Sequence, residues 1–169
     1  TVDPVVSNNL RLRDVANNVA GNTLPAEPYF MYTTGNYFKA RRNNGRFENV
    51  GETLYSSAYD MGEGWTSAEF NGTNKTELTN LFVYIGAGVP DSRFSIALSG
   101  NRMNLRRYRV KINGDSVLGK QMDIYNDSKE SAVVRTSLLS TNKATIEVSN
   151  INSVSTDRIV IHQYELTYP

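Results

Sequence analysis

Residues 105–114 carry the feature that most constrains the fold. They read Leu-Arg-Arg-Tyr-Arg-Val-Lys-Ile-Asn-Gly, and from the third residue on apolar and cationic side chains alternate strictly. Because successive side chains of a β-strand point to opposite faces, this pattern predicts a strand with a cationic stripe in water and Tyr108, Val110 and Ile112 in a core. The closing Asn113-Gly114 accepts the positive φ angles of a type I′ turn, so we expect a hairpin here.

Further short strands are indicated along the second half of the chain. Apolar residues alternate in Phe94–Leu98 and in Ala144–Val148. In the last stretch, Asp157–Tyr168, the alternation changes phase, which predicts either a β-bulge around His162-Gln163 or a strand that passes from fully covered to half covered. The strands recur roughly every 8–12 residues, which is the spacing typical of sandwiches and barrels. We therefore predict an all-β fold of antiparallel strands, a two-sheet β-sandwich or a barrel, with at most one or two short helical turns.

The first half gives weaker signals. We expect Tyr29–Tyr32 to be a strand followed by a turn at Thr33–Asn36. Asn74–Asn80 begins with an Asn-x-x-Glu capping signal and predicts a short helical turn. The apolar run Leu81–Ile85 predicts a strand covered on both faces. Asn44-Gly45 predicts the tip of a basic hairpin.

The chain divides into an N-terminal arm, residues 1–28, and a single sandwich domain, residues 29–169. The arm has two prolines near its end and reads as an extended segment. Its simplest role is an edge strand that closes the sandwich. The alternative is a segment that pairs with a neighbouring subunit by strand addition.

Composition excludes several functions. Eighteen Lys and Arg residues nearly balance 17 Asp and Glu residues, so no overall charge favours nucleic acid, and we expect no nucleic-acid partner. The absence of cysteine excludes disulfides, thiolate metal sites and cysteine nucleophiles. No apolar run approaches the length of a membrane span. The one histidine, His162, lies in an apolar strand, where a hydrogen-bonded structural role is the usual one. With no nucleophile elbow or phosphate loop either, we expect no enzyme.

The sequence has more side chains suited to binding a ligand than to catalysis, and they lie around the one tryptophan. Sugars are held by an aromatic face against their C–H surface, with carboxylates and arginines bonding their hydroxyls. The candidate ligand-binding residues are the aromatic residues Trp65, Tyr59 and Tyr55, the acids Asp60 and Glu63, and the basic residues Arg41 and Arg46. Trp65 decides between two roles, because an exposed ring would be a stacking platform and a buried ring a core anchor. A lone tryptophan is more often buried, so we expect burial.

The acids near Trp65 have three interpretations. Asp60, Glu63 and Glu69 could be the carboxylate pair of a glycosidase, ligands of Ca²⁺, or solvated turn residues. Their spacing matches no known loop, and solvated turn acids are the commonest case. We therefore expect no cofactor, with Ca²⁺ as the alternative.

A second cationic cluster lies in and beside the strand predicted within residues 105–114. Its members are Arg102, Arg106, Arg107, Arg109 and Lys111. It could receive a sulfated, sialylated or uronic-acid glycan, or nucleic acid if this face lines a shell. In a nearly neutral chain, a solvated outer face paired with acids on a neighbouring strand, such as Asp123 or Glu147, is the simpler interpretation.

The closing segments resemble a known family. Arg107–Ile112, Ala144–Val148 and Thr156-Asp-Arg-Ile159 are similar to the last strands of galactose-binding-like jelly-roll domains. These domains include carbohydrate-binding modules and the last domain of insecticidal crystal toxins. The resemblance covers about the last third of the chain. It implies a two-sheet jelly roll whose end loops are available for glycans, and it assigns no ligand residue.

Two functions follow as hypotheses. The first is a non-enzymatic surface module, extracellular or on a particle or cell surface, that binds glycans or a cell-surface receptor. The second is a structural jelly-roll subunit of a viral shell, fibre or surface appendage, a homo-oligomer or larger assembly in which the N-terminal arm makes intersubunit contacts.

Overall fold

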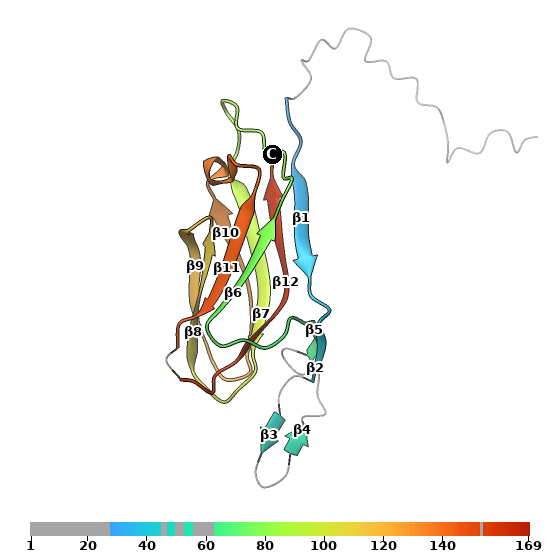
Figure 1. Ribbon diagram of the computed structural model, residues 1–169, viewed down its shortest axis with the longest axis vertical. Coiled ribbons are helices and arrows are strands. Elements are labelled where there is room, and N and C mark those ends of the chain that lie inside the picture. Colours follow the sequence, from blue (N-terminus) through green and yellow to red (C-terminus); the bar gives the residue numbers. More distant parts are fainter. Residues whose placement is uncertain (1–27, 45–46, 50–52, 56–62, 153) are drawn as a thin grey trace, which may run out of the picture.

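The fold is a sandwich of two four-stranded antiparallel sheets, as the alternation predicted (Figure 1). The computed structural model describes residues 28–44, 47–49, 53–55, 63–152 and 154–169. In their spatial order across the sheet, the strands of the first sheet are β1 (Tyr32–Tyr37), β12 (Ile159–Tyr168), β7 (Ser92–Gly100) and β10 (Asp127–Val134). The second holds β6 (Thr73–Leu78), β11 (Ala144–Asn150), β8 (Arg106–Ile112) and β9 (Asp115–Met122).

Two small ribbons extend the sandwich at its lower end in Figure 1. β2 (Arg41–Asn44) pairs with β5 (Glu63–Thr66), and β3 (Phe47–Asn49) pairs with β4 (Thr53–Tyr55). The one helical element in the described part is a 3₁₀ turn, η3 (Thr136–Leu139). No described helix is long and apolar enough to cross a membrane.

The strand at residues 106–112 forms as predicted. Tyr108, Val110 and Ile112 are buried in the core, and β8 pairs with β9 on one side and with β11 on the other. Asn113 and Gly114 have φ angles of 49° and 92°, so the turn between β8 and β9 is the positive-φ hairpin that the dipeptide predicted.

The core lies between the inner faces of the two sheets. Its fully buried side chains include Phe94 and Leu98 of β7, Ile146 of β11 and Leu166 of β12. The hydroxyl groups of Thr76 and Tyr164 lie 2.7 Å apart, and their hydrogen bond joins β6 of one sheet to β12 of the other. Burying alternate apolar side chains of both sheets is what holds such a sandwich together.

The predicted bulge in the last strand is confirmed. The pairing of β12 with β7 shifts register between Ile161 and Gln163, at His162. Residues before the bulge are buried consecutively, and residues after it alternate, which explains the change of phase in the sequence.

Two predictions for residues 74–85 are wrong. Asn74–Leu78 belongs to β6, because pairing with β11 satisfies the backbone that the capping signal would have turned into a helix. Leu81–Ile85 is irregular: Leu81 is buried, but Phe82 is 83% exposed and has a φ of 52°, a left-handed angle that no strand contains.

The start of the domain also differs from the prediction. The strand begins at Tyr32 and runs through Thr33–Asn36, where a turn was expected. Gly35 permits this, because a Cβ there would meet the carbonyl oxygen of Tyr164 on β12. Residues 1–27 lie outside the described residues, so the N-terminal arm stays a prediction.

Arg106 does not belong to a solvated cluster. Its side chain is fully buried, where it forms an ion pair with the equally buried Asp157. Strict alternation places Arg106 on the core side of β8, together with Tyr108, and the sequence alone did not reveal its partner.

Candidate functional site

The ribbon of β2 and β5 exposes Trp65 on its outer face. Arg42 lies directly across from Trp65 in the register, and both side chains are exposed. Trp65 is 55% exposed, so the expectation that it is buried is wrong. The opposite face of the ribbon explains this, because Asn43 and Thr66 take the buried positions there.

The predicted ligand-binding residues divide between the two faces. Glu63 is two residues before Trp65 and shares the outer face. Arg41 lies on the inner face, where its Nη1 is 2.9 Å from Oε1 of Glu69. Tyr59, Asp60 and Arg46 lie outside the described residues, and Tyr55 is placed on β4 by its backbone alone. The structure therefore brings Trp65 and Glu63 to one face and leaves Arg41 on the other.

His162 anchors the ribbon to the sandwich. Its Nε2 is 2.9 Å from Oγ of Ser99. Burial lowers the pKa of His162, and a hydrogen bond with the backbone of Trp65 opposes that shift only in part. The imidazole is therefore held in its neutral form as a hydrogen-bonded structural residue, as the sequence predicted.

The acids near Trp65 do not assemble into a metal site within the described part of the chain, where no three acidic or histidine side chains come together. Glu69 is instead bound by basic and amide groups, Arg41 and Asn101 Nδ2. A carboxylate that accepts from an arginine is a poor ligand for Ca²⁺, so Glu69 does not fit the calcium alternative.

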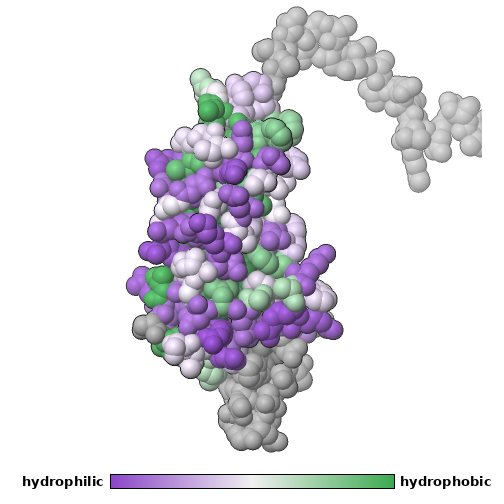
Figure 2. All heavy atoms as spheres, in the orientation of Figure 1, coloured by the Kyte–Doolittle hydropathy of each residue, from purple (hydrophilic) through white to green (hydrophobic). Residues whose placement is uncertain are grey.

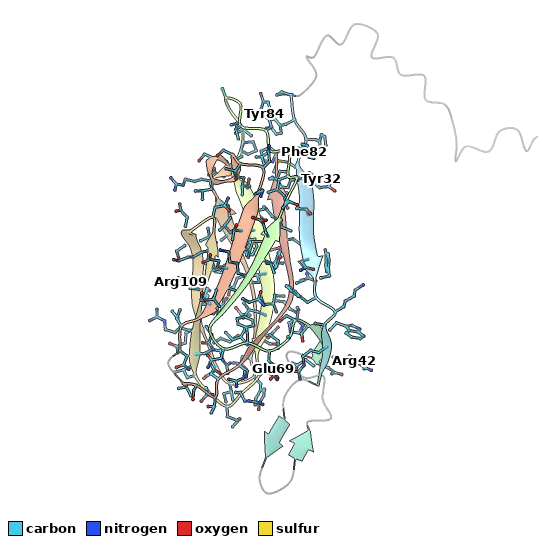
Figure 3. All side chains as sticks on the ribbon, viewed as in Figure 1. Tyr32, Arg42, Glu69, Phe82, Tyr84 and Arg109 are labelled. Atoms are coloured by element: carbon cyan, nitrogen blue, oxygen red, sulfur yellow. The ribbon has the colours of Figure 1, made fainter. Side chains whose placement is uncertain are left out.

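A second candidate site, which the sequence did not predict, lies at the opposite end of the sandwich. Here an open cavity of about 770 Å³ lies between residues 28–32, residues 80–84 and the end of β12. We call it the aromatic cleft. Figure 3 labels three of its residues, Tyr32, Phe82 and Tyr84, and Figure 2 shows hydrophobic residues coming to the surface at the same end.

Aromatic rings dominate the aromatic cleft. Tyr29 stacks on Tyr84 with the ring centroids 5.4 Å apart, and Tyr32 meets Tyr168 edge-on at 6.0 Å. Phe30 and Phe82 stay largely exposed. All the side chains that line the cleft are uncharged; they are Pro28, Tyr29, Phe30, Tyr32, Asn80, Leu81, Phe82, Val83, Tyr84, Tyr168 and Pro169.

Asn142 fixes the loop that forms one wall of the aromatic cleft. Its backbone carbonyl accepts from the amide of Leu81 at 3.1 Å, and its Oδ1 accepts from the amide of Val83 at 2.9 Å. The amide of Tyr84 donates to the carbonyl of Pro169 at 2.9 Å. These bonds hold Phe82 in its left-handed conformation with the ring directed away from the core.

The sequence contained one usable signal for this loop. Asn80 and Asn142 both have positive φ, and asparagine is among the residues that tolerate that region. An apolar run preceded by such a residue suits an irregular loop as well as a strand. The contact between Tyr29 and Tyr84, 55 positions apart in the chain, has no local signature.

The cationic stripe of β8 is an ordinary outer face over part of its length. Lys111 lies across from Glu147 in the register, as predicted, and Lys75 on the other side of Glu147 forms an ion pair with it at 3.3 Å. Asp123, the other predicted partner, forms none of the ion pairs seen among the described residues. Surface pairs of this kind contribute little stability.

No protein-family model and no curated protein matches the sequence. Among solved structures, the dimeric latent PorU of Porphyromonas gingivalis matches with a TM-score of 0.51 and 9% identity, over 83% of this chain and 13% of that one. The CBM36-1 domain of a multidomain xylanase from the hindgut metagenome of Trinervitermes trinervoides matches with a TM-score of 0.45 and 12% identity, over 80% and 96%.

A third match is the carbohydrate-binding module CBM36 in complex with calcium and xylotriose, with a TM-score of 0.44 and 9% identity, over 79% of this chain and 98% of that one. Carbohydrate-binding modules thus recur among the similar structures, and the two-sheet sandwich that the resemblance of the closing strands implied is the fold observed. At these identities the likeness is one of fold.

Proposed function

We propose that this domain is a non-enzymatic surface module that binds uncharged glycans in the aromatic cleft. One observation carries the proposal: an open cavity of about 770 Å³ is lined by exposed aromatic rings and by no charged side chain. Ligand sites of this size are usually concave, largely apolar and supplied with a few polar groups.

The chemistry of the aromatic cleft suits a neutral sugar. Pyranose rings present C–H surfaces that pack on aromatic faces, and Phe30 and Phe82 offer such faces to the solvent. Tyrosine hydroxyls and the side-chain amide of Asn80 can bond sugar hydroxyls as donors or acceptors. A cleft without charged side chains has nothing to pair with an acidic sugar, which favours a neutral one.

The names of the carbohydrate-binding modules state glycan binding for those proteins. Their similarity to this chain is one of fold, so the proposal rests on the aromatic cleft.

Trp65 is the second candidate platform, because its ring is exposed beside Arg42 and Glu63. A single ring on a flat ribbon offers one stacking surface, whereas the aromatic cleft offers several around a cavity. We therefore place the principal site in the cleft and retain Trp65 as a separate proposal.

A glycan array followed by calorimetry on the best glycan tests the proposal. Phe82→Ala removes an 83% exposed ring and should weaken binding at least about tenfold, or about 1.4 kcal/mol, without lowering the melting temperature. Val133→Ala, which removes an exposed side chain of β10, is the matched control and should change nothing.

The outcomes separate the two platforms. Binding that survives Phe82→Ala and is lost in Trp65→Ala moves the site to the ribbon. The absence of binding to any neutral glycan refutes glycan recognition by the cleft. The alternative function, a structural subunit, depends on residues 1–28 and stays a prediction that the oligomeric state of the purified protein tests.

A further inference from the structure

Four polar side chains meet where the β2–β5 ribbon joins the sandwich, and we call them the Glu69 cluster: Arg41, Glu69, Asn101 and Arg102. Glu69 lies 2.9 Å from Nη1 of Arg41 and 4.0 Å from Nη2 of Arg102. It also accepts a hydrogen bond from Nδ2 of Asn101. Figure 3 shows Glu69 at the end of the molecule opposite Phe82 and Tyr84, so this cluster is separate from the aromatic cleft.

The charge of the Glu69 cluster is not balanced internally. Two guanidinium groups face one carboxylate, which leaves one net positive charge. Within the described part of the chain, neither arginine has another acidic partner. Their side chains are 41% and 40% exposed, and each guanidinium has five N–H donors, so both can still receive an anionic group from solvent.

Asn101 carries the second, independent observation. The residue is only 2% exposed, and its Oδ1 has no hydrogen-bond donor. Turning the amide round would set that oxygen against the carboxylate of Glu69, so the donor to Glu69 must be Nδ2. A buried acceptor without a partner is destabilising, and native structures rarely contain one unless something else supplies the donor.

The backbone around Asn101 is firmly held. The amide of Asn101 donates to the carbonyl of Arg158 at 3.0 Å, and the carbonyl of Arg102 accepts from Nη2 of the buried Arg106 at 2.7 Å. The unpaired oxygen therefore belongs to a residue whose backbone is held in place and whose side-chain nitrogen donates to the same carboxylate that the two arginines contact.

We propose that the Glu69 cluster binds a hydroxy-carboxylate of the kind found in sugar acids. The ligand's carboxylate pairs with the guanidinium groups of Arg41 and Arg102, whose planar forks match that anion. A neighbouring ligand hydroxyl donates to Oδ1 of Asn101. Oδ1 of Asn101 is enclosed in the unliganded protein, so ligand binding requires the groups around this oxygen to move aside. Glu69 acts as a positioning residue that holds both arginines.

This occupant explains both observations together. A bare anion satisfies the arginines and leaves the Asn101 oxygen without a donor, while a neutral sugar does the reverse. The four members of the cluster are all polar, which suits a polyhydroxylated ligand better than the C-terminal residue of a peptide with an apolar side chain.

Titration calorimetry with matched ligands tests the proposal on the whole protein. Galacturonate offers the carboxylate and the hydroxyls, galactose the hydroxyls alone, and cyclohexanecarboxylate the carboxylate alone. We expect galacturonate to bind at least about tenfold more tightly than either. Arg102→Gln should weaken galacturonate binding at least about tenfold, and the exposed Arg107→Gln is the matched control and should leave it unchanged. Oligogalacturonate tests whether the acid is read as a free sugar or within a polymer.

Three results would overturn the proposal. Equal binding of cyclohexanecarboxylate makes this a plain anion site, and tighter binding of a peptide with a free C-terminus makes it a peptide site. No binding of galacturonate, together with a lower melting temperature of Arg102→Gln, makes the cluster a structural latch. Phe82→Ala should not affect galacturonate binding, so failure of the aromatic cleft and failure of this site are distinguishable.

Discussion

Arg106 of β8 and Asp157, which precedes β12, form a fully buried ion pair. Nε of Arg106 lies 3.0 Å and 3.1 Å from the two carboxylate oxygens of Asp157, and its Nη2 lies 2.8 Å from Oδ1. Nδ2 of Asn150 at 2.7 Å and the backbone amide of Arg158 at 2.9 Å also donate to the carboxylate. Gly100 leaves room for the guanidinium, because a Cβ there would meet it. The pair fixes the loop that carries Asn101 and Arg102.

Asp157→Asn should destabilise the domain by about 3–5 kcal/mol, because it leaves the Arg106 charge buried without a counter-charge. Urea unfolding followed by tyrosine and tryptophan fluorescence measures this loss. Glu77→Gln is the control: Glu77 pairs with Lys143 at 4.0 Å on the surface, and its replacement should cost less than about 1 kcal/mol. Equal effects of the two substitutions would contradict a structural role for the buried pair.

The same carboxylate should contribute to acid sensitivity. Burial alone would raise the pKa of Asp157, but hydrogen bonds from Arg106 and Asn150 and the charge of Arg106 outweigh it and lower the pKa below its ordinary 3.8. The stability that this shift contributes is present above pH 3.8 and is lost as the pH falls through the lower pKa of the folded state. Unfolding free energies measured from pH 6 to pH 2 should therefore fall less steeply in Asp157→Asn than in the wild type.

His162 should give a separate step at higher pH. Burial lowers its pKa from 6.5, so the unfolded chain takes up a proton before the folded one does. Stability should therefore decline as the pH falls below 6.5 and level off below the folded-state pKa. His162→Gln should abolish this step and leave the decline near pH 4 intact. Because the chain has no other histidine, a step that persists in this variant would disprove the assignment.

Two glycines in strands should respond oppositely to alanine. At Gly35 a Cβ would meet the carbonyl oxygen of Tyr164, so Gly35→Ala should push β1 from β12 and cost about 1–3 kcal/mol. At Gly119 of β9 the nearest atom lies 3.7 Å from the added Cβ, an ordinary contact. Gly119→Ala should be neutral or stabilise by up to about 1 kcal/mol, because the unfolded chain loses freedom. Thermal unfolding of both variants tests the pair, and equal losses would contradict it.

The fold could be predicted wherever the local pattern and the tertiary environment agree. The alternation at Tyr108, Val110 and Ile112, and the dipeptide Asn113-Gly114, each specify one backbone geometry, and the sandwich supplies it. Asn74 and Gly35 show the opposite case. There, pairing with β11 and with β12 decides the structure, and pairing between distant segments leaves no mark on the nearby sequence.

The candidate sites were harder to predict for the same reason. Trp65 was identified as the central residue of one site, but its exposure depends on which face of a four-residue strand meets the sandwich. The aromatic cleft combines residues 28–32 with residues 80–84 and 168–169, and the Glu69 cluster combines β2 with two loops. Residue type indicated what each side chain can do, and only the fold shows which of them meet.

Asn142 offers the most direct test of how the aromatic cleft is held together. Asn142→Gly keeps the backbone carbonyl and the φ of 56°, and removes only the side-chain oxygen that accepts from the amide of Val83. Hydrogen exchange at that amide should therefore accelerate by about two- to tenfold, the equivalent of a hydrogen bond worth about 0.5–1.5 kcal/mol. Exchange at Leu81, whose partner is the backbone carbonyl of residue 142, should change little. If the loop must be held rigid for binding, the variant should also weaken glycan binding without lowering the melting temperature. Accelerated exchange throughout the sandwich would show instead that Asn142 supports the whole domain.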